Sequence, residues 1–235
     1  MQFKPNLLRY LLPIVFSLSY HQSTAQVDES QTGGWYMYFY NFSFDDSRWG
    51  IQGDIQYRDW EIMGDPEQLL LRSGVTYRPE NTNLLLTIGY ANITSGQFGD
   101  STANTVERRA YQEALLPWTV GERLLFTHRF RYEQRWVENQ DFRTRYRYNL
   151  FLNIPLNNTT LEEGTVYVAL YNELFINGQR NIGGGRRVEW FDRNRAYMGL
   201  GYVVNPRSRI QVGWMNQATV GNDKGQLQFS LHQKF

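Results

Sequence analysis

The stretch from Gly121 to Pro155, GERLLFTHRFRYEQRWVENQDFRTRYRYNLFLNIP, decides the fold. In its first half, one set of alternate positions holds Leu124, Phe126, His128, Phe130, Tyr132 and Trp136, and the other holds Arg129, Arg131, Glu133 and Arg135. Successive side chains of a β-strand point to opposite faces, so a period of two predicts a strand. After the polar break at 138–141, Tyr146, Tyr148, Leu150, Leu152 and Ile154 alternate with Arg145, Arg147 and Asn149 in the same way. The stretch therefore predicts two long antiparallel strands, each with an apolar face and an arginine-rich face.

This pattern inverts that of a water-soluble sheet, which buries its apolar face against a core. A transmembrane β-barrel instead turns its apolar face to lipid and its polar face to an aqueous interior. Similar alternation recurs at 49–58, 69–78, 84–90, 107–113, 166–174, 196–204, 209–217 and 226–234, and the aromatic segment 35–44 adds a further strand. We therefore expect residues 26–235 to form one all-β, antiparallel transmembrane barrel.

Eleven segments of the sequence look like strands, whereas bacterial single-chain barrels have even strand numbers. This rule favours about 12 strands, within a range of 10 to 12, with the additional strand inside residues 26–34 or hidden in a long loop. Short turns near residues 45, 80, 120, 159 and 206 alternate with longer breaks near 64, 100, 139, 184 and 221. Short turns are typical of the periplasmic side, so the C-terminus is expected in the periplasm. The final strand ends on Phe235, an aromatic end suited to barrel-assembly machinery.

The first 25 residues read as a secretory signal peptide that is cleaved. Lys4 and Arg9 precede the short apolar run YLLPIVFSLSY at 10–20, and small residues lead to a cut before Gln26. The run is too short for a spanning helix and contains Pro13. The sequence therefore predicts export, with the outer membrane as the location and its lipid as the surroundings.

Composition excludes several other classes of function. Removing Lys4 and Arg9 from 24 Lys and Arg leaves 22 basic against 23 acidic side chains, so no basic excess indicates nucleic acid as a partner. The chain has no cysteine, which excludes disulfides, thiolate metal sites and a lipoprotein anchor. Gly183, Gly184 and Gly185 lack the other parts of a phosphate-binding loop. We expect no cofactor and no metal.

Five motifs carry a resemblance to a known family. They are HRFRYEQRW (128–136), RYRYNLFLNIPL (145–156), YNELFIN (171–177), FDRNRAYMGLGY (191–202) and IQVGWMNQ (210–217). In this order they resemble the uncharacterised Gram-negative outer-membrane family catalogued as domain of unknown function 2490. The resemblance covers essentially the whole mature chain and implies a barrel-forming outer-membrane protein of unassigned role. It implies no catalytic residues.

The candidate functional residues are the charged side chains of the predicted inner face. As lumen residues we expect Arg109, Glu113, Arg129, Arg131, Glu133, Arg135, Arg143, Arg145, Arg147, Glu173 and Arg195, together with Arg72, Arg78 and Arg209. Arginine keeps its charge when partly desolvated, so this excess predicts a small porin-like channel for anionic solutes. In the alternative, the glutamates pair with arginines, the interior is closed, and the protein acts through external loops on a partner.

A membrane-embedded lipid or ester hydrolase is the third hypothesis, although we expect no enzyme. Ser230 and His232 share a face, but such positions lie roughly 7 Å apart along a strand, too far for a direct hydrogen bond without help from rotamers. A further hypothesis concerns the loop at 177–190. Asn172 and Glu173 could form a salt-bridged collar with residues 193–195 that holds this loop over the barrel mouth.

Overall fold

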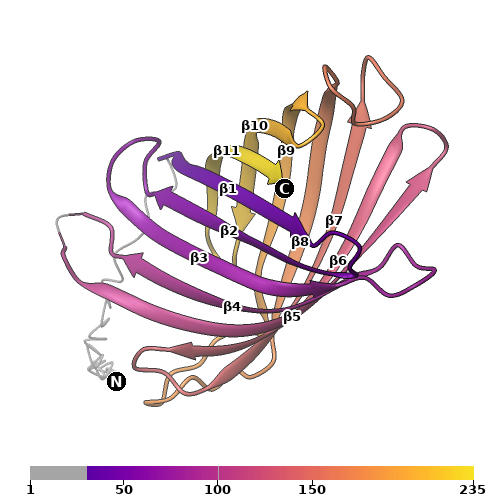
Figure 1. Cartoon of the computed structure of the whole chain (residues 1–235). Helices are drawn as coiled ribbons and strands as arrows, with labels where there is room; N and C mark the ends of the chain where they lie inside the picture. The colour runs from indigo at the N-terminus through magenta and orange to yellow at the C-terminus, as the bar shows by residue number, and fades with distance from the viewer. Residues whose placement is uncertain (1–30, 100) are drawn as a thin grey trace, which may run out of the picture.

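The computed structural model describes residues 31–99 and 101–235, and within them the chain forms a closed barrel of 11 strands (Figure 1). The strands are β1 (Gly33–Ser43), β2 (Trp49–Asp59), β3 (Pro66–Tyr77), β4 (Leu85–Gly96), β5 (Asn104–Val120), β6 (Leu124–Val137), β7 (Arg143–Pro155), β8 (Val166–Asn177), β9 (Phe191–Asn205), β10 (Ser208–Ala218) and β11 (Asp223–Lys234). The all-β prediction is confirmed. The predicted signal peptide and residues 26–30 lie outside the described residues, so most of segment 26–34, one of the two expected places for an additional strand, does too.

The favoured number of 12 strands is wrong for the described chain, and the direct count of 11 segments is right. Sequential strands pair antiparallel, but β1 and β11 close the barrel as a parallel pair, from Gly33 opposite Gln226 to Asn41 opposite Lys234. A parallel ladder also pairs the backbone groups of both edge strands, although it is slightly less stable per residue than an antiparallel one, so closure does not require an even number of strands. The barrel is therefore mixed rather than purely antiparallel.

Because the number of strands is odd, the first strand begins and the last strand ends at opposite rims of the barrel. β1 and β11 run in the same direction, so Gly33 lies at the rim where β11 begins, and Lys234 lies at the other rim. We call the rim with segments 60–65, 97–103, 138–142, 178–190 and 219–222 the loop end. The rim with segments 44–48, 78–84, 121–123, 156–165 and 206–207 is the turn end. Gly121, with a φ of 59°, allows the tight β5–β6 turn.

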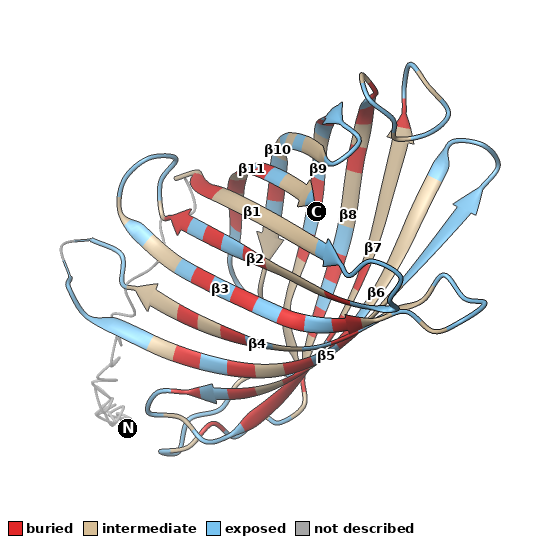
Figure 2. Ribbon diagram, in the orientation of Figure 1, coloured by how far each residue is buried: buried red, intermediate tan, exposed pale blue. Residues whose placement is uncertain are grey.

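Burial alternates along the strands with a period of two, as Figure 2 shows for β2 and β3. Large apolar side chains occupy the exposed outer positions, among them Ile55, Leu71, Val75, Ile88, Phe130, Trp136, Tyr146, Met198, Leu200, Val212, Trp214 and Phe229. The inner positions of β6 and β7 hold the charged residues instead, including Glu133 and Arg145. The two-faced interpretation of the central hairpin is thus correct. None of the described residues forms a helix long and apolar enough to cross a membrane.

The barrel interior is filled by aromatic as well as charged side chains. Trp35, Tyr167, Ala169, Tyr197, Val203 and Met215 form one buried cluster. Gly201 makes room for it, since a Cβ there would lie 2.1 Å from the ring of Tyr167. At the loop end, Phe175 and Met215 are buried, and the Nζ of Lys224 donates a hydrogen bond to the carbonyl of Trp60 at 2.9 Å. Side chains thus pack inside the barrel at its loop end.

Candidate functional site: a charged interior cavity

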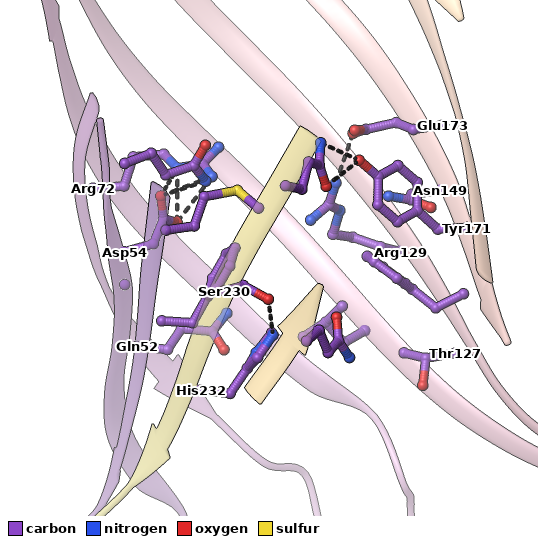
Figure 3. A pocket seen from close by; sticks show the side chains of 18 of the residues that line it. Gln52, Asp54, Arg72, Thr127, Arg129, Asn149, Tyr171, Glu173, Ser230 and His232 are labelled. Carbon is purple, nitrogen blue, oxygen red and sulfur yellow. Dashed lines mark hydrogen bonds and ion pairs between the residues drawn. The ribbon is translucent and has the colours of Figure 1, made fainter. Parts of the chain in front are cut away.

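A cavity of about 560 Å³ occupies the barrel interior. Its lining extends from Arg58 and Gln68, near the loop end, to Arg207 in the β9–β10 turn. Turn residues Leu161, Pro206 and Arg207 line it, whereas no described residue of the five loop-end segments does. The cavity therefore opens at the turn end. Figure 3 shows side chains from opposite walls, such as Asp54, Arg129 and Ser230, pointing into it.

Glu133 is the centre of an ion-pair network on one wall. It is 1% exposed and accepts hydrogen bonds from Arg145 at 2.7 Å and Arg147 at 2.6 Å. Arg109 and Arg131 each place a guanidinium nitrogen 3.9 Å from the same carboxylate. The strand register places Arg145 and Arg147 beside Glu133, because β7 pairs with β6 so that Arg145 lies opposite Glu133. One buried carboxylate thus holds four guanidinium groups.

Two further glutamates extend the network around the barrel. Glu173 on β8 lies 2.6 Å from Arg129 on β6, as Figure 3 shows for this pair, and 2.6 Å from Arg147 on β7, so it links three strands. Glu113 on β5 binds Arg131 at 2.5 Å and lies 3.8 Å from Arg129. Each arginine of this group therefore contacts two carboxylates. Charge-assisted pairs of this kind are stronger than neutral hydrogen bonds and fix side-chain positions.

Three interior carboxylates were missed by the sequence reasoning. Asp54 binds Arg72 through hydrogen bonds of 2.9–3.1 Å, and Glu107 binds both Arg109 and Arg135. Both lie at inward positions of alternating strands, so the period of two could have found them. Asp192 is different, because a bulge in the β8–β9 pairing adds one residue to β9 and turns its carboxylate toward Arg145, at 2.9 Å. Alternation alone does not predict a bulge.

All eleven residues expected in the lumen belong to the inner face of the barrel. Nine of them line the cavity, namely Arg109, Glu113, Arg129, Arg131, Arg135, Arg145, Arg147, Glu173 and Arg195. Glu133 and Arg143 are buried behind the lining. Arg72 and Arg209 also line the cavity, whereas Arg78 is exposed at the turn end just after β3 and is not part of the lining. A role of these residues in a pore remains a prediction.

Ser230 and His232 make the direct contact that was expected only with help from side-chain rotamers. The Oγ of Ser230 lies 3.1 Å from the Nε2 of His232, within hydrogen-bond distance, and both side chains line the cavity (Figure 3). The backbone spacing is that of a strand, but the two side chains lean toward each other along one face. The His232 ring also stacks on Phe39 at 4.7 Å. The structure thus brings together a hydroxyl and an imidazole that strand spacing alone keeps apart.

The expected collar around loop 178–190 is wrong. Glu173 pairs with Arg129 and Arg147 inside the barrel, while Asn172 and Asn194 exchange hydrogen bonds of 3.0 Å on the outer face. The loop instead packs against segment 138–142, where the amide of Asp141 donates to the carbonyl of Ile182 at 2.9 Å. Its position depends on the neighbouring loop rather than on residues 193–195.

Comparisons with known proteins agree with the sequence motifs. The family model described as a protein of unknown function, DUF2490, matches residues 32–228, which include all of β1 to β10 and half of β11. A protein of Methylorubrum extorquens described as uncharacterised is 30% identical over 177 residues, which cover 72% of this chain and 73% of that protein. No solved structure matches the chain. The expected resemblance is confirmed: the chain belongs to the DUF2490 family, whose function is unknown.

Proposed function

We propose that this chain is an outer-membrane β-barrel whose interior receives small anionic solutes through the turn end. The observation that carries the proposal is the charge of the cavity lining, which contains twelve arginines but four carboxylates. Glu133 and Asp192, which do not line the cavity, also pair with these arginines, but six carboxylates still cannot neutralise twelve guanidinium groups. An excess of charge of one sign attracts mobile counter-ions. Oxyanions suit this lining, because guanidinium groups bind carboxylates and phosphates through paired hydrogen bonds.

The entrance supports the same proposal. Arg207, Arg209 and Lys234 line the cavity at the turn end, where the last turn and the end of β11 meet. A cationic rim raises the local concentration of anions and speeds their entry. Because short turns are typical of the periplasmic side, the solutes would enter from the periplasm. The apolar outer face supports the placement in a lipid bilayer.

A direct test measures the unfolding midpoint of the purified, folded barrel against anion concentration at constant ionic strength. Citrate and inorganic phosphate are expected to raise the midpoint, because a ligand that binds only the folded state stabilises it. Chloride and the cation spermidine serve as controls without this effect. A midpoint that is the same in all four solutions would contradict the proposal. Fractionation of cells tests the location, and recovery in the soluble fraction would contradict membrane insertion.

A porin-like channel is the second candidate, favoured by the depth of the cavity. Arg58 lines the cavity although it is the penultimate residue of β2 at the loop end, so only a thin layer of packed side chains separates the two sides. Single-channel recording in planar bilayers under a salt gradient distinguishes the candidates. Steady anion-selective current that changes in Arg131→Glu and Arg145→Glu would support the channel. Silence from folded barrels supports the blind cavity or the closed barrel that acts through its loops.

A further inference from the structure

Arg58 and Arg195 differ from the other buried arginines of the cavity. Both are nearly inaccessible, at 6% and 8% exposure, and both line the cavity. Within the described residues, neither side chain lies within ion-pair distance of a carboxylate. Of the other nine buried or half-buried arginines of the strand lining, eight do, and the exception is Arg209, which is half-buried at the turn end. Both charges therefore lack a direct ion pair, and carboxylates act on them only at longer range, Glu67 on Arg58 and Glu173 on Arg195.

The carboxylates nearest in the strand register are already engaged. Glu173 lies opposite Arg195 in the β8–β9 pairing, but it binds Arg129 and Arg147 at 2.6 Å. Asp54 on the strand of Arg58 binds Arg72. The partners of the two arginines are neutral amides: Arg58 donates to the oxygens of Gln56 and Gln68, and Arg195 donates to Gln217 at 2.8 Å. Neutral acceptors satisfy N–H groups but do not cancel the charge.

Trp35 brings the two arginines together from separate strands. The Arg58 guanidinium carbon lies 3.7 Å from the centre of the Trp35 ring, and that of Arg195 lies 4.8 Å from it. The pairing of β1 with β2 places Arg58 directly opposite Trp35. Arg195 reaches the same ring from β9, which is not paired with β1. The indole Nε1 of Trp35 is buried and has no hydrogen-bond partner in the described chain. Two cations thus contact one aromatic side chain that lines the cavity and carries an unpaired donor.

A buried charge without a counter-charge is costly, and an isolated buried donor adds to that cost. From this cluster of Trp35, Arg58 and Arg195, we propose a binding site for one oxyanion group, a phosphate or carboxylate, of a solute that enters the cavity. The proposal rests on the proposed function and assigns the site within that cavity. The two guanidinium groups and the indole N–H would donate hydrogen bonds to the oxyanion. A doubly charged group such as a phosphate monoester matches the two cations best.

Isothermal titration of the folded, full chain in a phosphate-free non-ionic detergent tests the site, with inorganic phosphate as the probe. Arg58→Gln and Arg195→Gln are each expected to weaken binding by about tenfold or more, because each removes a charged donor. Arg143→Gln is the matched control. Arg143 is equally buried and has no ion pair in the described chain, but it does not line the cavity, so its replacement should leave the affinity unchanged.

A second measurement separates ligand binding from a structural role. Without phosphate, Arg195→Met should unfold at the same or a higher midpoint than the unsubstituted chain, since a buried charge without a direct ion pair is removed. With phosphate, only the unsubstituted chain and the Arg143 control should gain stability. Should an arginine variant fail to fold, Trp35→Phe keeps the aromatic contact but removes the N–H, and it should weaken phosphate binding several-fold.

The outcomes distinguish the site from the broader function. If phosphate binds the unsubstituted chain and both arginine variants equally, this site is refuted while the anion-accepting cavity stands. If no oxyanion binds the unsubstituted chain, the proposed function fails as well. The source of the phosphate is resolved by comparing glycerol phosphate with a short-chain phosphatidic acid. Tighter binding of the lipid would indicate a headgroup, and equal binding a free solute.

Discussion

Replacing Glu133 by glutamine is expected to destabilise the barrel strongly. The carboxylate is 1% exposed, accepts hydrogen bonds of 2.7 and 2.6 Å from Arg145 and Arg147, and lies 3.9 Å from Arg109 and from Arg131. Glutamine keeps the volume and one acceptor but removes the charge that these four guanidinium groups share. Removing one partner of a buried ion pair costs about 3–5 kcal/mol, because the other charge stays buried. We expect a loss of this size in the free energy of unfolding.

The assay is equilibrium unfolding in urea with the barrel in detergent micelles, followed by tryptophan fluorescence. Glu163→Gln is the control, since this glutamate lies exposed in the β7–β8 turn and its replacement should change stability by about 0.5 kcal/mol or less. In a double-mutant cycle, Arg145→Gln added to Glu133→Gln should cost less than it does alone, because the repulsion left by the first change is relieved.

A loss below about 1 kcal/mol for Glu133→Gln would refute this reasoning, because an exposed or water-solvated carboxylate behaves in this way. Water would then reach the four arginines, and the interior would be wet around its most buried charge. Such a result would favour the open channel over the blind cavity. The stability measurement thus bears on function as well as on packing.

Three further predictions follow from the barrel. An epitope inserted before Gly33 should be accessible on the same membrane face as one in loop 97–103, and an epitope after Lys234 should be accessible on the opposite face. Protease protection of intact cells checks this. Finding the epitopes before Gly33 and after Lys234 on one face would contradict the parallel closure. Gly201→Ala should cost about 1–3 kcal/mol in urea unfolding, since its Cβ would lie 2.1 Å from the Tyr167 ring, and a neutral result would show that the ring moves freely. Met198→Arg places a charge on the outer face, at a side chain that is 67% exposed, and should cost about 2–4 kcal/mol in lipid, whereas an unchanged stability would contradict lipid contact.

Alternation of side chains was sufficient to predict the inner and outer faces. Each strand of the central hairpin has one inward and one outward set of side chains. Only the charged set, with Glu133, Arg145 and Arg147, suits an aqueous interior. The same reasoning covers the outward positions of Phe130 and Tyr146. These predictions succeeded because the period of two is a local property of the extended backbone.

Closure of the barrel is not a local property. Whether the first and last strands meet in parallel or antiparallel orientation depends on the total number of strands. The 11 strand-like segments of the sequence match the 11 strands of the barrel, and the expectation of 12 came from the even strand numbers of other barrels. The inward turn of Asp192 depends on a bulge, and the contact between Ser230 and His232 depends on rotamers chosen by surrounding side chains. None of these can be derived from residue spacing.

The sequence by itself therefore determined an all-β chain with an apolar outer face and an arginine-rich inner face, because both properties follow from the order of residues along single strands. Only the tertiary structure decided which arginines have a counter-charge. Arg147 contacts two carboxylates from neighbouring strands, whereas Arg58 and Arg195 meet at Trp35 without an ion pair in the described chain. Such pairing depends on strand register and on distances across the barrel interior. Both are fixed only when the barrel closes and brings together residues that lie far apart in the chain.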